Sequence, residues 1–378
     1  MPEAIYLDHA ATSWPKPAAV EEEVVRRLRE VTANVGRSSH GADLRSARLL
    51  FDVRSRLARL FGAWEPARVV FTRGATEGLN LVLKGFLRQG DRAAVSPLEH
   101  NAVMRPLSRL VRERGIEVET LPADPLGRID LEAAAKLDGR YRLAAVAHGS
   151  NVNGVVQDIR ALAQAMPSTP LLLDAAQTAG VVPIDLAAAS VAFMACSAHK
   201  GLLAPTGLGV LCLSPDHEVE PLMEGGTGSQ SEATEQPIFP PDRYEAGTLP
   251  VHAIAGLRGA LGHIEAHGLL GDRKRRLVTR LLDGLREAPG IRLIAPTDGT
   301  ALLLSFTLEG LPPDRVARTL EREHGILCRP GLHCSPAAHR HLGTLPQGTV
   351  RLAPGFGNTE ADIDAAVRAV HAVARQGG

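Results

Sequence analysis

Lys200 lies between two uncharged stretches, in a chain that has five lysines among its 42 Lys and Arg residues. The run VAFMAC ends just before Ser197, and GLLAPTGLG follows the lysine. A dry pocket disfavours the charged form of a lysine, so its neutral amine becomes available as a Schiff-base nucleophile toward a carbonyl group. For this residue alone, a solvated lysine at a strand end remains the alternative.

A Schiff-base lysine calls for a carbonyl cofactor, and pyridoxal phosphate also needs an acid for its ring nitrogen, a phosphate site and a platform for the ring. Asp174 ends the run LLLD and can supply the acid, or it can cap a helix. At an expected helix start, Gly74, Ala75 and Thr76 can hold a phosphate through backbone N–H groups, the helix dipole and a hydroxyl. His100 can lie over the ring, or it can be a structural histidine.

The elements that would position these residues follow a regular order between residues 68 and 215. Short apolar runs alternate with helical patterns, which predicts a mostly parallel sheet covered by helices. The expected strands are 68–72, 93–96, 117–121, 143–148, 171–174, 191–197 and 209–213, and expected helices include 77–88, 103–114 and 131–137. Since ligands bind beyond the carboxyl ends of such strands, the residues singled out should converge on one site.

The second half of the chain predicts a different organisation. Residues 229–250 favour a long irregular segment and residues 251–288 favour helix. Strands are expected at 291–294 and 301–308, a helix at 315–323, and a final helix capped by Thr359 and Asp362. We therefore expect a large domain at 15–254 and a smaller α+β domain formed by 1–14 and 255–378.

Composition limits the classes of protein that are possible. With 378 residues, 44% hydrophobic and 22% charged, the chain can form a full core and is not mainly disordered. The 42 basic residues cancel the 42 acidic ones, which argues against a nucleic-acid partner. The basic run at 273–276 predicts a solvated helix face. No apolar run reaches the roughly 18 residues of a membrane span, so we expect no membrane contact.

The cysteines and the N-terminal residues indicate a cytoplasmic protein. Asp8 and His9 stand where a signal peptide would need its apolar core. Four cysteines without a CxxC pair suit a reducing compartment, and we identify no set of metal ligands.

A series of motifs in this order resembles the cysteine desulfurase and selenocysteine lyase family, within the class V aminotransferases. DAAQ at 174–177 and SAHKGLLAPTGLG at 197–209 resemble its cofactor motifs. Further similar segments are YLDHAATSWPKP at 6–17, FTRGATEGLN at 71–80, SPLEHNA at 96–102, YEAGT at 244–248 and RPGLHC at 329–334. The resemblance implies the pyridoxal-phosphate-dependent transferase fold of type I, with a mostly parallel seven-stranded sheet between helices and a smaller C-terminal α+β domain. RPGLHC resembles the active-site cysteine segment of group II members.

The same resemblance implies the cofactor contacts. Lys200 would bind the cofactor covalently, Asp174 would pair with the pyridine nitrogen and His100 would stack on the ring. Gln177 would bond the ring hydroxyl, with Asn151 near that oxygen. The implied phosphate site consists of Gly74, Ala75, Thr76, Ser197, His199 and, from the partner subunit of a homodimer, Thr248.

Substrate contacts follow from the resemblance too. Arg351 matches the arginine that binds the substrate carboxylate, a task that suits its planar, bidentate guanidinium. Asn34 and His40 lie in a segment that resembles part of the substrate pocket. Cys334 matches the nucleophile; a buried apolar cysteine is the alternative, but Pro330 and Pro336 flank it and favour an exposed loop. We expect Cys196, Cys212 and Cys328 to be structural.

The implied reaction converts L-cysteine to L-alanine and leaves a persulfide on Cys334, with Lys200, Cys334 and His100 as catalytic residues. The sulfur would pass to an acceptor protein or a reductant. A C–S or C–Se β-lyase for selenocysteine or another cysteine derivative, without need for Cys334, stays open, as does an aminotransferase or epimerase. The sequence departs from the family pattern at Phe356 and Gly357, in the segment 229–241, and at Gly149, where we expect a gap. These departures leave the identity of the substrate open.

Overall fold

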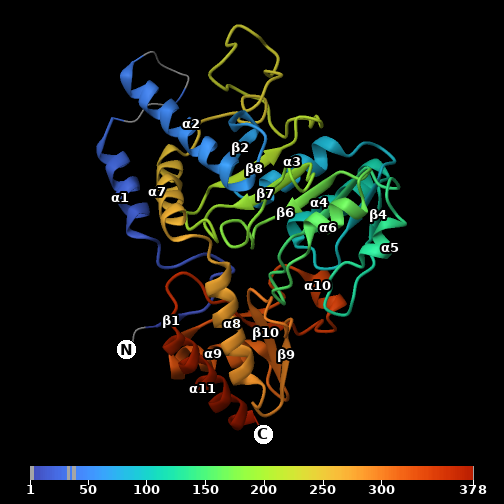
Figure 1. Cartoon of the computed structure of the whole chain (residues 1–378), viewed down its shortest axis with the longest axis vertical. Helices are drawn as coiled ribbons and strands as arrows, with labels where there is room; N and C mark the ends of the chain where they lie inside the picture. The colour runs from blue at the N-terminus through green and yellow to red at the C-terminus, as the bar shows by residue number, and fades with distance from the viewer. Residues whose placement is uncertain (1–3, 32–34, 36–39, 378) are drawn as a thin grey trace.

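The computed structural model describes residues 4–31, 35 and 40–377, and its largest sheet has seven strands (Figure 1). The strands are β2 (Val69–Thr72), β3 (Arg92–Val95), β4 (Glu117–Thr120), β5 (Leu143–Ala147), β6 (Leu171–Asp174), β7 (Phe193–Ser197) and β8 (Gly209–Leu213). They lie in the order β2-β8-β7-β6-β5-β3-β4. Strand β8 runs opposite to the other six described strands, so the expected mostly parallel sheet is confirmed.

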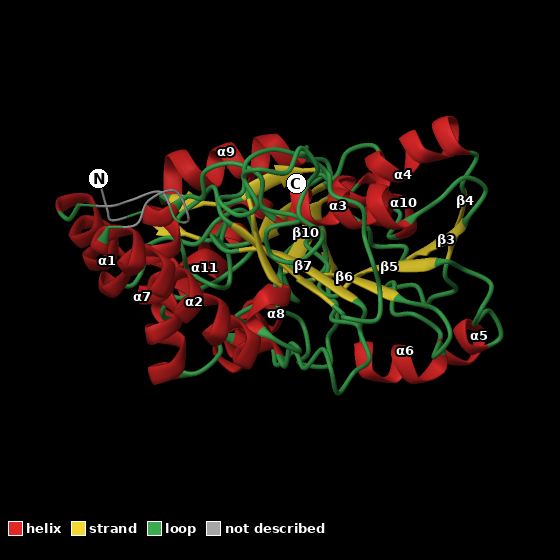
Figure 2. Cartoon of the chain, turned by 90° about the horizontal axis from the view of Figure 1, so that it is seen from above, coloured by secondary structure: helices red, strands yellow, loops and turns green. Residues whose placement is uncertain are grey.

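Helices cover both faces of this sheet (Figure 2). One face packs against α3 (Ala75–Phe86) and α4 (Asn101–Arg114). The other packs against α2 (Gly41–Phe61), α6 (Ile159–Ala165) and α7 (Val251–His267), with α1 (Ala18–Arg29) against α7 and α5 (Leu131–Ala135) against α6. Successive residues such as Leu172 and Leu173 enter opposite cores, which is why these strands are apolar throughout.

A second, antiparallel sheet lies at the C-terminal end of the chain (Figure 1). Its strands are, in spatial order, β12 (Arg329–Gly331), β13 (Thr349–Leu352), β10 (Leu304–Leu308) and β9 (Ile291–Ile294). Around it lie β1 (Ile5–Tyr6), paired with β11 (Ile326–Leu327), and the helices α8 (Gly271–Leu285), α9 (Pro313–His324), α10 (Pro336–His341) and α11 (Glu360–Gly377). The backbone N–H and hydroxyl of Thr359 bond reciprocally with Asp362 at the start of α11, as its sequence predicts.

The helical stretch expected at 251–288 is divided into two helices, α7 and α8. The chain turns at Gly268, whose φ of 80° lies in the left-handed region. Helix α7 contributes to the core of the large sheet, whereas α8 contributes to the core of the small one. We propose the two-domain division that the sequence predicts, with its later boundary moved to 268–270.

The prediction of a solvated face for the basic run at 273–276 is wrong for one residue. Arg273 and Arg276 are exposed, but Lys274 is buried and donates a hydrogen bond to the Pro354 carbonyl at 2.6 Å. Helical spacing explains this, because Lys274 shares a face with Leu277 and the other buried residues of α8. Burial lowers its pKa to about 8.

Two further expectations concern segments of the described chain. Residues 229–250 contain neither helix nor strand, so the irregular segment is confirmed. None of the described helices combines the length and apolar character needed to cross a bilayer.

Candidate active site

The register of the large sheet brings several strand ends to one edge. Asp174, the last residue of β6, pairs with Ala147 on one side and with Ala195 on the other. On the antiparallel strand β8, Gly209 pairs with both Ser197 and Thr72. The carboxyl ends of β2, β5, β6 and β7 therefore meet at the same edge, as the strand order predicts.

A cavity at this edge brings together most of the residues expected to contact the cofactor. Two come from α3, one precedes α4 and the others lie at or after the ends of β5, β6 and β7. These lining residues are Ala75, Thr76, His100, Asn151, Asp174, Gln177, Ser197 and Lys200. Five strand ends thus supply one site.

Lys200 has the dry surroundings that its sequence setting predicts. Burial lowers the pKa of its amine to about 8; the negative Asp174 opposes this, and the positive Arg351 and Arg329 add to it. The neutral, nucleophilic form of the amine is therefore accessible close to neutral pH.

Asp174 and His100 are both held by local hydrogen bonds. The Asp174 carboxylate is buried and accepts the Ala176 N–H at 3.0 Å, so it closes a turn while it lines the cavity. The Nδ1 atom of His100 accepts the Ala102 N–H at 3.0 Å and caps α4. Burial lowers the pKa of this imidazole, which leaves it neutral with its proton on Nε2.

The start of α3 has the features of a phosphate site. The Ser197 hydroxyl accepts the Ala75 N–H at 3.0 Å, so it lies at the helix N-terminus. Gly209 lets β8 approach this loop, since a Cβ there would lie 2.4 Å from the Gly74 Cα. Thr76 is exposed in the next position. Backbone N–H groups, the helix dipole and two hydroxyls are thereby directed to one place.

Other residues expected at the site contact different parts of the chain. The His199 ring bonds the Thr12 hydroxyl through Nδ1 at 3.0 Å, and His199 is not among the residues that line the cavity. Gln177 lines the cavity, but its side chain donates to the Ala10 carbonyl at 3.0 Å. His40 is exposed just before α2 and lies outside the cavity lining. Asn34 lies outside the described residues.

Arg351 joins the small sheet to the cavity. It is fully buried in β13, where its Nη2 atom pairs with Asp8 Oδ1 at 2.6 Å and its Nη1 donates to the Asn151 carbonyl at 3.0 Å. Burial lowers its pKa and the Asp8 charge raises it. Its Nε atom has no partner among the described residues. Arg351 is not among the residues that line the cavity, which it reaches only through Asn151.

Cys334 is exposed in the loop between β12 and α10, although its neighbours His333 and Ser335 are buried. His333 and Cys334 both have left-handed backbones, with φ of 49° and 60°. The Cys334 carbonyl accepts the Asn101 N–H at 2.8 Å, which docks the loop next to His100. Arg329 Nη2 lies 3.6 Å from the Cys334 Sγ atom, so a positive charge lies beside the sulfur.

The other three cysteines have the buried character expected of structural residues. Cys196 and Cys212 are fully enclosed in β7 and β8, and Cys328 is half-buried. Burial raises the pKa of Cys196 and Cys328 to about 12, and it also raises the pKa of Cys212 well above its ordinary value. Among the four, all within the described chain, Cys334 alone is exposed.

The sequence predicted no role in the site for Glu99, Arg329 or Ser335. Asp8 was considered only as a charged residue at a position where a signal peptide would be apolar. Arg329 belongs to the RPGLHC segment and Glu99 precedes His100. Their closeness to these motifs is the sequence feature that could have identified them as site residues. Glu99 is fully buried beside the cavity, and burial raises its pKa to about 8. It accepts hydrogen bonds from the Ser96 hydroxyl at 2.5 Å and the Ala147 N–H at 2.6 Å.

The gap expected beside Gly149 is absent. A Cβ at this position would lie 2.6 Å from the Cγ2 methyl of Thr178, so Thr178 fills the space. The expectation is wrong because residues following β6 pack against the segment after β5, a contact that the local sequence does not reveal.

Thr248 is exposed at the end of the irregular segment, outside the cavity lining. The preceding Glu245 anchors this segment, since its buried carboxylate pairs with Arg54 Nη2 at 2.6 Å and accepts the Phe71 N–H at 2.5 Å.

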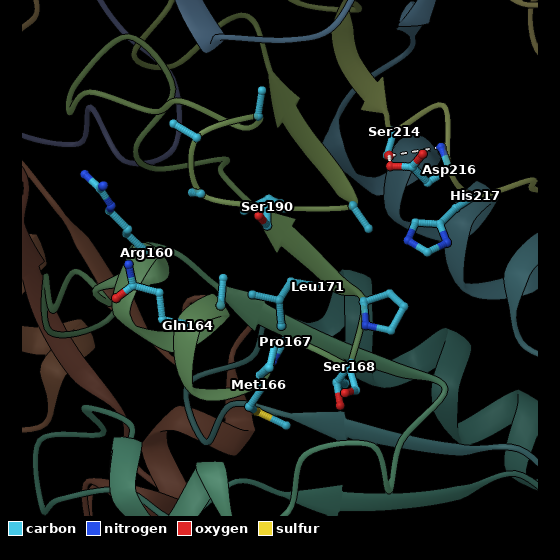
Figure 3. A pocket seen from close by; sticks show the side chains of 18 of the residues that line it. Arg160, Gln164, Met166, Pro167, Ser168, Leu171, Ser190, Ser214, Asp216 and His217 are labelled. Carbon is cyan, nitrogen blue, oxygen red and sulfur yellow. Dashed lines mark hydrogen bonds between the residues drawn. The ribbon is translucent and has the colours of Figure 1, made fainter.

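A second cavity, of about 490 Å³, lies at the opposite edge of the large sheet. Its lining includes Leu171 at the start of β6, Ser214 just after β8, and the polar side chains of Arg160, Asp216 and His217 (Figure 3). None of its described lining residues is a lysine. The cavity at the carboxyl edge is therefore the candidate active site.

Known proteins are similar to this chain over nearly its whole length. The family described as "Aminotransferase class-V" matches residues 5–366. Probable cysteine desulfurases of Methanothermobacter thermautotrophicus and Pseudomonas aeruginosa are 33% and 34% identical, each covering 95% of this chain and 92% and 91% of the relative. The apo structure of a cysteine desulfurase from Thermococcus onnurineus has a TM-score of 0.91 at 30% identity, over 99% of this chain and 95% of that one. The cysteine desulfurase CsdA from Escherichia coli has a TM-score of 0.88 at 30% identity, over 99% and 96%.

Proposed function

Because the chain belongs to the class V aminotransferase family, we propose that it is a pyridoxal-phosphate-dependent cysteine desulfurase that forms L-alanine from L-cysteine and holds the sulfur on Cys334. The observation that carries this proposal is the joining of two groups at one site. A half-buried lysine lines the cavity with an acid, and an exposed cysteine lies in a loop that is bonded to Asn151 of the same cavity. Relatives and solved structures named cysteine desulfurases, matched over most of their length, support it.

The residues present fit the cofactor. Lys200 would bind it, Asp174 would face its ring nitrogen, His100 would lie over the ring, and Ser197 with Thr76 would hold its phosphate at the start of α3. Ring contacts from Asn151 and Gln177 belong to this proposal, as do phosphate contacts from Gly74, Ala75 and His199. When bound, pyridoxal phosphate supplies an electron sink for the carbanion that forms at the substrate Cα.

The side chains of the site divide the work of the reaction. Lys200 Nζ is the group that we expect to accept the Cα proton, because burial lowers its pKa to about 8. The neutral His100 ring excludes water from one side of the cavity and offers its Nε2 proton. Arg351, which Asp8 orients, would bind the substrate carboxylate. Asn34 and His40 belong to the proposed substrate pocket of the assembled protein.

The sulfur transfer step takes place at Cys334. Its thiolate Sγ attacks the substrate sulfur, so that an S–S bond forms while the substrate Cβ–S bond breaks. The electron pair of the broken bond stays with Cβ, which takes up a proton. Cα then regains the proton that Lys200 accepted, which gives alanine. Cys334 remains as a persulfide, which passes its outer sulfur to an acceptor protein or a reductant. Exposure of Cys334 supports this last step.

We propose that the protein works as a cytoplasmic two-fold homodimer in which Thr248 reaches the partner's phosphate site. Large apolar side chains on α2 support an interface there, since Leu44 and Phe51 are 57% and 64% exposed. Phe51 also lines a cavity with Leu249, the neighbour of Thr248. A monomeric protein with full activity would contradict this part of the proposal.

Product analysis with L-cysteine, L-selenocysteine and cysteine disulfides in parallel tests the proposed function. We expect alanine and a protein-bound persulfide from L-cysteine, with weak turnover that rises when an acceptor protein is supplied. Efficient turnover of another cysteine derivative without persulfide on Cys334 would favour a β-lyase instead.

A further inference from the structure

Asn151 holds the Cys334 loop on both sides of the cysteine. Its Nδ2 atom donates to the His333 carbonyl at 2.7 Å, and its Oδ1 accepts the Ser335 hydroxyl at 2.7 Å. Both ends of one side-chain amide are therefore used on the two neighbours of Cys334. Asn151 lies after β5 in the large-sheet half of the chain, 184 positions from Ser335.

The loop depends on such contacts because its backbone conformation is unfavourable. His333 and Cys334 are consecutive residues with positive φ, a region that side chains other than glycine rarely adopt. Strained backbone of this kind persists only where the surroundings define it. Other contacts also hold the loop. They include the Asn101 N–H to the Cys334 carbonyl at 2.8 Å, His333 Nε2 to the Thr349 hydroxyl at 3.0 Å and the Ser335 N–H to the Leu332 carbonyl at 2.8 Å.

We propose that Asn151 and Ser335 form a clamp that positions the Cys334 thiol for sulfur transfer. Asn151 is a positioning residue in this role, in addition to any contact with the cofactor, and Ser335 is its partner. The proposal rests on the function proposed above, since it concerns the same thiol.

The clamp also links the thiol to the substrate arginine. The Asn151 carbonyl accepts Arg351 Nη1 at 3.0 Å, while the Asn151 side chain holds the loop. One residue at a strand end thus contacts the loop, the cavity and the arginine expected to bind the substrate carboxylate. The position of Cys334 relative to a bound substrate is set by this residue.

Ser335→Ala tests the clamp, with Ser305→Ala as a matched control. Both serines are fully buried, and the Ser305 hydroxyl donates to the carbonyl of Val152 at 2.5 Å, next to Asn151 but away from the loop. In the holoprotein, the rate of Cys334 alkylation by iodoacetamide would be followed by mass spectrometry. Loss of one buried hydrogen bond should raise this rate about fivefold in Ser335→Ala, and Ser305→Ala should match the wild type.

A second readout separates positioning from binding. In Ser335→Ala, kcat for persulfide formation should fall by a similar factor while KM for L-cysteine and the visible absorbance of the bound cofactor stay unchanged. Asn151→Ala should raise Cys334 alkylation as well, and the double variant should add little to either single change because the two residues form one contact.

Equal alkylation rates in Ser335→Ala, Ser305→Ala and the wild type would overturn the clamp, as would fully additive effects of Asn151→Ala and Ser335→Ala. Alkylation needs no L-cysteine, so it tests the clamp even if the wild type forms no persulfide. That latter result would instead remove the proposed function.

Discussion

The half-buried Lys200 and the buried Lys274 have similar pKa values and different surroundings. Burial lowers the pKa of both Lys200 and Lys274 to about 8. Lys200 lines a cavity with Asp174, whereas Lys274 donates to the Pro354 carbonyl at 2.6 Å in the interior of the small-sheet region. A lowered pKa therefore indicates only that a lysine is buried. A catalytic lysine must also line a cavity and lie close to a charged partner.

The largest expected difference in activity is between variants of the two lysines. Lys200→Ala should lose the visible absorbance of the bound cofactor and lower alanine formation by roughly 10²–10⁴-fold, because the base and the point of attachment are removed together. Lys274→Met, the matched control, should keep both properties. Absorbance spectra and alanine assays of the two variants decide this, and an unchanged cofactor band in Lys200→Ala would remove the central claim.

The next effect distinguishes the loop cysteine from a nearby structural one. Cys334→Ala should lose persulfide formation and lower alanine formation from L-cysteine on the order of a hundredfold, since the nucleophile for the substrate sulfur is absent. Cofactor absorbance should remain, and turnover of selenocysteine should survive. Cys328→Ala, which alters a half-buried cysteine, should retain persulfide formation. Wild-type turnover of L-cysteine by Cys334→Ala would leave the desulfurase mechanism untenable.

The pH dependence of lysine labelling tests whether the two lysines differ in reactivity because of the cavity and not because of their pKa values. Only the neutral amine reacts with acetic anhydride, so labelling of Lys200 in cofactor-free protein should rise with pH through a midpoint of about 8. Lys274 has a similar pKa, but its amine is enclosed and should stay unlabelled while the protein is folded. Exposed Lys136 serves as the internal reference. Equal labelling of Lys200 and Lys274 would contradict the comparison.

The smallest expected effect is on stability. The folded protein releases the Lys274 proton at about pH 8 and the unfolded chain at its ordinary pKa of 10.5. The unfolded state binds more protons between these values, so this lysine makes stability rise with pH from 8 to 10.5. Lys274→Met should reduce that rise and change the free energy of unfolding by no more than about 2 kcal/mol, as the desolvation cost and the lost hydrogen bond offset each other.

Urea unfolding of cofactor-free protein at pH 8 and pH 10 measures this slope. Lys200 contributes a similar rise to both proteins, so the difference between variant and wild type isolates Lys274. Identical slopes would show that Lys274 does not titrate in this window.

The sheet and much of the site were predictable because their signals are local. A strand buried on both faces needs a continuous apolar run, and LLLD and GVLCL coincide with β6 and β8. Parallel strands present their carboxyl ends at one edge, so the order of elements is enough to bring Lys200, Asp174 and His100 to one cavity.

The predictions that were wrong concern contacts between segments that are far apart in the sequence. The sequence around Gly149 does not show that Thr178 fills the adjoining space, and the charge run around Lys274 does not show which residue turns inward. Both depend on how one element packs on another, which composition and periodicity leave open.

The amino-acid sequence alone predicted the positions of the strands along the chain, the rare lysine at a strand end and the cysteine loop, because these depend on neighbours within a few residues. Tertiary structure alone decided the pairing of Arg351 with Asp8, 343 positions away, and the hold of Asn151 on the Cys334 loop. Such contacts form only when β13 and β12 of the small sheet meet the edge of the large one. The geometry of these contacts is therefore determined by how the two sheets pack together, and no single segment of the chain predicts it.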